Sequence, residues 1–180
     1  MGRSVSRINP WAAAFLAGAA LALGVSGCAT GQERKQSKEW STLRLYLEAE
    51  SEDSAKTTVV PVYRKKPILV RIFKEPILDE GHVVSASVVN VLGGFAIRVQ
   101  YDFHGTLRLE EASNYYRGRR LVIHSYFPEG RWLAAPTLSR PITDGVIVFT
   151  PDATREEAER IVLGLNNLAR KLGNQPKKKK

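Results

Sequence analysis

Residues 84–103 read VSASVVNVLGGFAIRVQYDF, and the two β-rich segments of this stretch flank Gly93-Gly94. A two-residue Gly-Gly loop favours a tight hairpin turn, because both glycines can adopt positive φ at little cost. A turn centred on these two glycines defines five pairs of residues that lie opposite each other on one face of the hairpin. The pairs are Phe95 and Leu92, Ile97 and Asn90, Val99 and Val88, Tyr101 and Ala86, and Phe103 and Val84. Nearly all of these residues are apolar, and the residues between them are mostly polar. The pattern predicts an antiparallel hairpin with one buried and one solvent-exposed face.

Helical spacing begins directly after this hairpin. Leu109, Ala112 and Tyr116 fall on one side of a helix, so residues 106–117 are expected to be helical. Gly118 follows and is well suited to end the helix.

The last predicted helix spans residues 154–172 and has the stronger signals. Thr154 and Glu157 have the spacing of a capping box, in which each side chain accepts a hydrogen bond from a backbone amide of the other's residue. Gly173 can terminate the helix. Its apolar stripe consists of Ala158, Ile161, Val162, Leu165, Leu168 and Leu172.

Alternating or β-rich segments predict the remaining strands. They are residues 43–49, 58–63, 68–73, 121–127, 132–138 and 146–149. Together with the two helices they predict an α+β fold, in which an antiparallel β-sheet has its helices packed on one face.

The amino-terminal residues have the layout of a secretory signal. Arg3 and Arg7 precede an apolar run over residues 11–25, which predicts a signal peptide over residues 1–27. Val25-Ser26-Gly27-Cys28 resembles the lipobox of bacterial lipoproteins. The resemblance implies cleavage before Cys28, a diacylglycerol thioether on its sulfur, and acylation of the new amino terminus by a fatty acid such as palmitate.

An uncleaved membrane-spanning helix is the alternative to a signal peptide. The apolar run is shorter than the ~20 residues that a spanning helix needs, and it contains Gly18 and Gly24. Lipidated Cys28 is therefore expected to attach the protein to a membrane of the bacterial envelope without spanning it. Ala29, in place of the Asp that retains some lipoproteins at the inner membrane, slightly favours the outer membrane facing the periplasm.

The mature chain divides by composition into three parts. Residues 28–39 are polar and predict a flexible tether, residues 40–173 a folded body, and residues 174–180 a disordered Lys-rich tail. The formal charge of +9 includes the signal arginines and the terminal lysines, so the body keeps only about +3. No basic patch indicates a nucleic-acid partner. Cys28 is the single cysteine, which excludes an internal disulfide.

The sequence contains no recognisable catalytic or metal-binding motif. His82, His104 and His124 are scattered, without the close spacing of a zinc site. Neither a nucleophile elbow nor a phosphate-binding loop occurs. We therefore expect no catalytic residues, no metal and no cofactor.

Aromatic residues that are expected to be exposed are the candidates for contact with an extended polypeptide or a glycan. Tyr126 and Trp132 are the two principal positions, and Trp40 and Tyr115 are further members of the group. Such side chains are favoured in binding surfaces. The alternative is that they cover the edge of the core.

The stretch from Phe73 to Leu172 resembles the head part of the first periplasmic domain of SecD, a subunit of the bacterial protein-export machinery. The resemblance rests on Glu75-Pro76-Ile77-Leu78, residues 83–86, Gly93-Gly94, residues 97–103, Gly105, Ala135-Pro136-Thr137-Leu138, Ile142-x-x-Gly145, residues 146–149 and residues 151–165. It implies a SecD-head-like α+β body over residues 40–173 without catalytic residues. SecD itself has six membrane-spanning helices that this sequence lacks, and the family's usual segment after the last helix is absent.

These features predict a non-catalytic, lipid-anchored envelope module that contacts exported polypeptides or a partner protein in protein export. A structural envelope lipoprotein that binds cell-wall glycan or a membrane assembly is the alternative. A hydrolase with an unrecognised site is the third hypothesis.

Overall fold

The computed structural model describes residues 39–50, 53 and 55–175. The predicted signal peptide, Cys28, the tether up to residue 38 and residues 176–180 of the predicted tail lie outside these residues. Asn174 and Gln175, the first two residues of that tail, form hydrogen bonds with the folded body. In chain order the elements are β1 (Thr42–Leu47), β2 (Thr57–Val62), β3 (Ile68–Phe73), a 3-10 turn η1 (Glu80–His82), β4 (Val83–Val91), β5 (Gly94–Tyr101), α2 (Phe103–Tyr115), β6 (Leu121–Tyr126), β7 (Gly130–Ala134), β8 (Val146–Phe149) and α3 (Arg155–Leu172).

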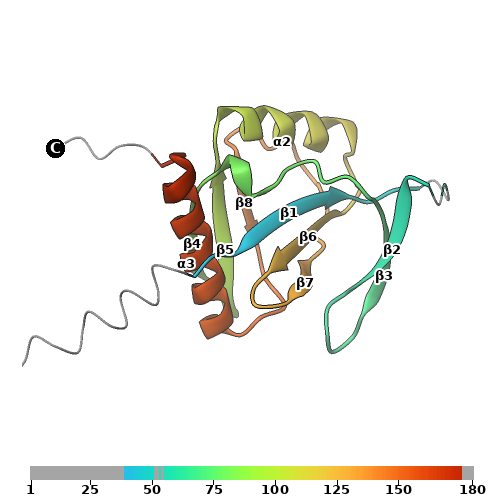
Figure 1. Cartoon of the computed structure of the whole chain (residues 1–180). Coiled ribbons are helices and arrows are strands. Elements are labelled where there is room, and N and C mark those ends of the chain that lie inside the picture. Colours follow the sequence, from blue (N-terminus) through green and yellow to red (C-terminus); the bar gives the residue numbers. More distant parts are fainter. Residues whose placement is uncertain (1–38, 51–52, 54, 176–180) are drawn as a thin grey trace, which may run out of the picture. The chain divides into compact units, whose positions relative to one another are not determined.

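The strands form three antiparallel sheets, ordered β1-β6-β7, β2-β3 and β4-β5-β8 (Figure 1). The predicted α+β class and the antiparallel pairing are confirmed. The prediction of one sheet was too simple, because the alternation of a strand does not specify which strand it pairs with.

The β4–β5 hairpin forms with its turn one residue earlier than predicted, which shifts the strand pairing by two residues. Val91 pairs with Gly94, so the loop is Leu92-Gly93, and Val88 pairs with Ile97 instead of Val99. Gly93 adopts φ +82°, whereas Gly94 belongs to β5 and lies outside the positive-φ region. A shift of two residues in the pairing keeps the side chains from Ala86 to Tyr101 on their predicted faces. At the start of β4 an irregularity between Val83 and Ser85 places Val83 in the core, where Val84 was predicted.

Asn90, the polar residue on the predicted apolar face, lies near the hairpin tip and is exposed. Its side-chain oxygen accepts a hydrogen bond from the guanidinium of Arg155, the first residue of α3. The tip of the hairpin therefore extends past the core and contacts the start of the helix.

Helix α2 begins three residues earlier than predicted. The Asp102 carboxylate accepts a hydrogen bond from the amide of Gly105 at 2.7 Å and caps the helix. Phe103 was expected to continue the buried face of the strand, but it is the first helical residue and is 72% exposed.

Helix α3 has the predicted capping box and ends at Gly173, which adopts φ +80°. It packs mainly along β4, where Ala158, Ile161 and Leu165 are buried (Figure 1). Leu172, the last residue of the predicted stripe, is exposed.

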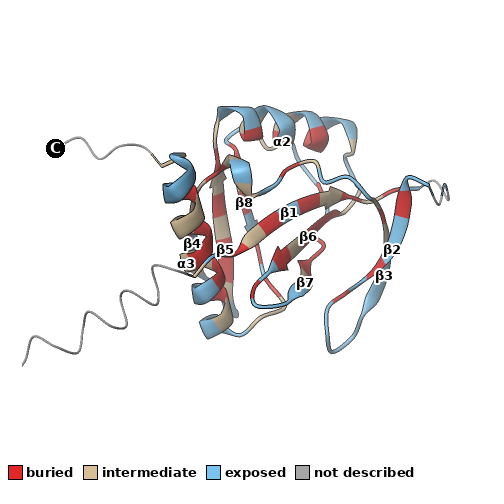
Figure 2. Cartoon of the chain, in the orientation of Figure 1, coloured by how far each residue is buried: buried red, intermediate tan, exposed pale blue. Residues whose placement is uncertain are grey.

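Two clusters of buried side chains stabilise the fold (Figure 2). The main cluster lies between the β4-β5-β8 and β1-β6-β7 sheets, and both helices contribute to it. The second cluster forms where the inner face of β2–β3 covers part of the β1-β6-β7 sheet. Its buried members are Val60, Val62, Val70, Ile72, Val122 and Ala135. The β1-β6-β7 sheet is therefore covered on both faces over part of its length.

Candidate binding surface

The uncovered part of the β1-β6-β7 sheet carries a group of aromatic side chains. Strand pairing places Thr42 opposite Tyr126, Arg44 opposite His124, and His124 opposite Trp132. Because side chains alternate between the faces of a strand, Arg44, His124, Tyr126 and Trp132 share the face that points away from the main cluster. We call these four residues together with Trp40 the aromatic face.

Ring contacts hold the aromatic face together. Trp40 stacks on Tyr126 with ring centroids 6.0 Å apart and an interplanar angle of 17°. The edge of Trp132 meets His124 at 4.7 Å and Tyr46 at 5.2 Å. Aromatic pairs at such distances are favourable beyond their area of burial. The surface is therefore formed in the absence of a partner.

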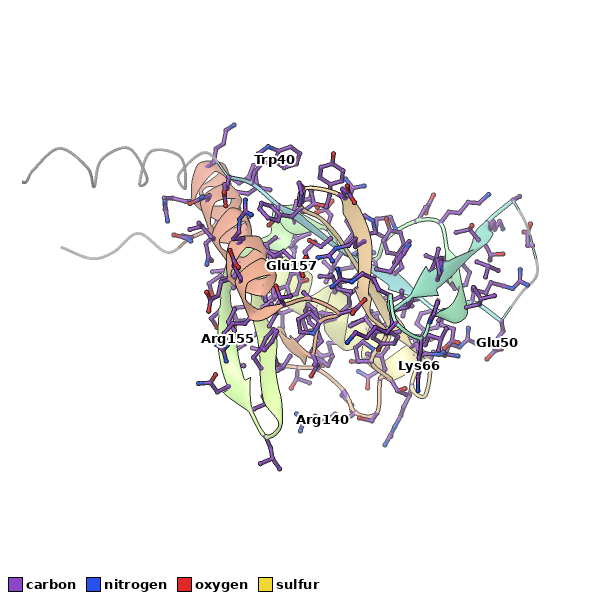
Figure 3. The ribbon with its side chains drawn as sticks, turned by 90° about the horizontal axis from the view of Figure 1, so that it is seen from below. Trp40, Glu50, Lys66, Arg140, Arg155 and Glu157 are labelled. Carbon is purple, nitrogen blue, oxygen red and sulfur yellow. The ribbon has the colours of Figure 1, made fainter. Side chains whose placement is uncertain are left out.

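The position of Trp40 depends on the adjoining helix. The Ser41 hydroxyl donates a hydrogen bond to the carbonyl of Ile161 at 2.6 Å, and Gly164 leaves space for the Trp40 and Ser41 backbone. Figure 3 shows Trp40 beside α3. A helix remote in the sequence thus brings Trp40 next to Tyr126.

The two residues predicted to contact a partner differ in exposure. Tyr126 is 47% exposed at the end of β6, and Trp40 beside it is 57% exposed. Trp132 is only partly exposed and packs against the second cluster. Tyr126 is consequently available to a partner, whereas Trp132 supports the surface from its edge. Tyr115, a further aromatic candidate, is 84% exposed on α2 and lies outside the aromatic face.

The charge state of the aromatic face is set by His124 and Arg44. Burial, and secondarily the positive charge of Arg44, lower the pKa of His124 below its ordinary value of 6.5. The ring is therefore neutral at neutral pH. Arg44 lies 3.6 Å from the Glu80 carboxylate, which balances its charge. The surface is mainly apolar, with a single paired cation at its centre.

A pocket of about 350 Å³ lies beyond Trp132, between β7 and the turn of the β2–β3 hairpin. Arg64 and Arg131 line it, and both form ion pairs with Glu157, at 3.5 and 3.4 Å respectively. Tyr63, another lining residue, adopts φ +72° and accepts a hydrogen bond from the amide of Ala135 through its hydroxyl. These contacts attach the hairpin turn to β7 and to the start of α3.

A second pocket, of about 410 Å³, lies beside β8 and is walled by residues 136–144. Arg140 and Asp144 are its ionisable lining residues, and it contains neither histidine nor cysteine.

The structure keeps the three histidines apart from one another. His82 lies 3.2 Å from the Asp102 carboxylate and links η1 to the start of α2. His104 contacts the ring of Phe103, and His124 belongs to the aromatic face. Within residues 39–50, 53 and 55–175, no group of three potential ligands is placed to bind a metal ion. Among the same residues, no helix is both long and apolar enough to cross a membrane.

Asn166 is a residue that the sequence pattern did not single out. Its side-chain amide accepts a hydrogen bond from the Ala86 amide and donates one to the Ala86 carbonyl, both at 2.9 Å. It thereby occupies the free edge of β4 in the manner of a neighbouring strand. No local signal identifies this role, because it depends on where α3 crosses β4.

No protein-family model and no curated protein matches the sequence at a significant level. Solved structures of SecDF share the fold, and two of them superpose on this chain as follows. The structure of a membrane component SecDF that enhances protein export superposes with a TM-score of 0.54 at 20% identity, covering 81% of this chain and 70% of that chain. A crystal structure of SecDF in a super-membrane-facing form superposes with a TM-score of 0.55 at 19% identity, covering 80% of this chain and 21% of that chain. The resemblance to a SecD periplasmic domain is confirmed at the level of the fold.

Proposed function

We propose that this chain is a non-catalytic, lipid-anchored module of the bacterial envelope, whose body contacts exported polypeptides or a partner protein in protein export. The likeness in fold to SecDF, a membrane component that enhances protein export, carries the proposal. The absence of a metal-binding cluster among the described residues is compatible with a binding role.

The aromatic face supports contact with polypeptide. Trp40 and Tyr126 present a stacked pair of rings that an apolar side chain of an extended segment can cover. Aromatic residues of this kind dominate the binding energy of many interfaces. The surface is small, and an interface under ~1,200 Å² is usually transient. We expect weak and reversible binding, because an exported polypeptide has to be released after contact.

Lipid anchoring through Cys28 is the second part of the proposal, and Val25-Ser26-Gly27-Cys28 supports it. Cys28→Ala should yield an uncleaved precursor that incorporates no radiolabelled palmitate. Palmitate on the Cys28→Ala protein would contradict the assignment. In the proposed arrangement the body lies on the periplasmic side of a membrane, with the outer membrane slightly favoured.

Photocrosslinking in living cells tests the binding role. A photoreactive residue at Tyr126 should capture export subunits or exported chains, and the same residue at the more exposed Tyr115 on α2 serves as the control. A probe at Trp132 is expected to react less, because that side chain is partly buried.

The same experiment separates the alternatives. Crosslinks from Tyr126 to cell-wall polymers alone would favour a structural lipoprotein that binds glycan or a membrane assembly. Equal crosslinking from Tyr126 and Tyr115 would show that the aromatic face is no specific surface. Hydrolysis by the purified chain, abolished by substituting His104 or His124, would contradict the non-catalytic role.

A further inference from the structure

The outer face of the β2–β3 hairpin carries exposed apolar side chains. Pairing places Pro61 opposite Leu69 and Val59 opposite Arg71, on the face that points away from the second cluster. Leu69 is 72% and Val59 46% exposed, and Pro61 is also exposed. Residues 63–69, the turn between the strands and the start of β3, are exposed in a row (Figure 2). A strand face turned to water is usually polar, so this apolar strip is unexpected.

Lysine side chains flank the strip at both ends of the hairpin. Lys65 and Lys66 lie in the turn between the strands, where Figure 3 labels Lys66, and Lys56 directly precedes β2. The carboxylates nearest the turn, those of Asp152 and Glu157, are paired with Arg64. Lysines therefore lie at both ends of the exposed apolar strip, and Asp53 lies three residues before Lys56.

The backbone of β2 argues against a further strand as the occupant of this region. Pro61 lacks an amide hydrogen, and a proline in a strand is compatible with an edge that does not pair. An occupant must therefore contact the outer face through side chains. A flat apolar strip bordered by lysines has the composition of surfaces that insert shallowly into a bilayer with anionic headgroups.

We infer that the outer face of β2–β3, made of Val59, Pro61 and Leu69 with Lys56, Lys65 and Lys66, docks on an anionic phospholipid surface. The apolar side chains enter the headgroup region while the ammonium groups contact lipid phosphates. Docking would orient the body relative to the membrane. The inference is independent of the anchor at Cys28 and of the proposed binding role.

A fluorescent probe on the full chain tests the inference. In a Cys28→Ser background, Leu69→Cys is labelled with an environment-sensitive dye and mixed with vesicles that combine phosphatidylglycerol and phosphatidylcholine. The emission should shift to the blue, and high salt or vesicles of phosphatidylcholine alone should abolish the shift. Leu92→Cys, at the fully exposed tip of the β4–β5 hairpin, is the matched control and should not respond. No shift at position 69, or equal shifts at both positions, would overturn the inference.

Charge removal gives a second, independent readout in the same background. Lys65→Gln with Lys66→Gln should lower the partition into anionic vesicles by about thirtyfold, because each cation near an anionic surface contributes about fivefold. Arg170→Gln with Lys171→Gln, in the last turn of α3, removes the same charge and should change the partition little. Equal losses for the two pairs would show that net charge alone drives binding, and would refute a specific docking face.

Discussion

The β4–β5 and β2–β3 hairpins are both two-stranded antiparallel units with an apolar inner face, but they are stabilised in different ways. The β4–β5 hairpin pairs with β8, is covered by α3, and has its free edge occupied by Asn166. The β2–β3 hairpin forms a sheet of its own and covers Val122 and Trp132 on a neighbouring sheet. The difference shows that similar strand patterns can build the centre of a domain or an appendage to it.

The size of the buried cluster behind each hairpin has an energetic consequence. The main cluster contains 22 buried residues and the second contains six. A side chain in the larger cluster is enclosed from all directions, whereas a two-stranded hairpin can shift to fill a gap. The two hairpins should therefore respond differently to the same substitution.

The largest expected difference is between Ile97→Ala and Ile72→Ala, which delete the same atoms from fully buried positions in the two clusters. Ile97→Ala should reduce the free energy of unfolding by about 3–5 kcal/mol and Ile72→Ala by about 2–3 kcal/mol. Urea denaturation measures both. Equal losses would mean that the β2–β3 hairpin is as integral to the fold as the β4–β5 hairpin.

Gly164→Ala tests how closely α3 approaches the chain before β1. A Cβ at Gly164 would lie 2.7 Å from the Ser41 backbone nitrogen, so the helix would have to move. We expect a loss of about 1–3 kcal/mol, although alanine normally stabilises a helix by about 1 kcal/mol over glycine. Glu159→Ala, at an exposed position of the same helix, should change stability by less than about 0.5 kcal/mol. Stabilisation by Gly164→Ala would show that α3 is not closely packed there.

Substitutions at the tip of the β4–β5 hairpin distinguish the observed turn from the predicted one. Gly93 has φ +82°, so Gly93→Val should cost about 1–3 kcal/mol. Gly94 lies in β5 with open space around it, and Gly94→Val should cost less than about 1 kcal/mol. Thermal unfolding of the two variants measures both losses of stability. A larger loss of stability for Gly94→Val than for Gly93→Val would favour the predicted turn at Gly93-Gly94 over the observed one.

The smallest expected effect concerns Glu157, which joins the two regions through its ion pair with Arg64. A hydrogen bond from the Thr154 amide, followed by the charges of Arg131 and Arg64, lowers the pKa of Glu157 below its ordinary value of 4.5. Its contribution to stability is therefore complete above that pH and is lost as the pH falls through the folded-state pKa.

Glu157→Gln should remove this pH dependence, while glutamine still accepts the capping hydrogen bond. Since the side chain is partly exposed, the change should stay below about 0.5 kcal/mol. Comparison of urea unfolding at neutral pH and at pH about 3 measures it. If the free energy of unfolding changed with pH as much in Glu157→Gln as in the unsubstituted chain, the role assigned to the carboxylate would be contradicted.

Local patterns predicted most of the elements but not their partners. The capping box of Thr154 and Glu157 and the alternation of Leu43, Leu45 and Leu47 indicated α3 and β1 correctly, because these signals act within a few residues. The start of α2 was predicted three residues too late, because a single residue, Asp102, separates the end of β5 from the helix and also caps the helix. The position of Trp132, at the junction of two sheets, depended on β2–β3 and had no local signal.

The aromatic face was predicted in part for the same reason. Tyr126 was predicted to be an exposed aromatic residue, and it is 47% exposed. Its stacking on Trp40 requires β1, β6 and α3 to meet, and Arg44 and His124 join the surface only through strand pairing. A sequence pattern can predict that an aromatic residue is exposed, but it does not predict which residues from other strands and helices contact it.

The sequence by itself determined the antiparallel hairpin, the capped last helix, the α+β class and the resemblance to the SecD head. Periodicity and capping depend on side chains a few residues apart, and these are readable without coordinates. Only the tertiary structure decided the division into three sheets, the turn at Leu92-Gly93, and the separation of the aromatic face from the apolar strip of β2–β3. Each of these depends on contacts between residues remote in the sequence, whose energies become favourable only once the chain has folded.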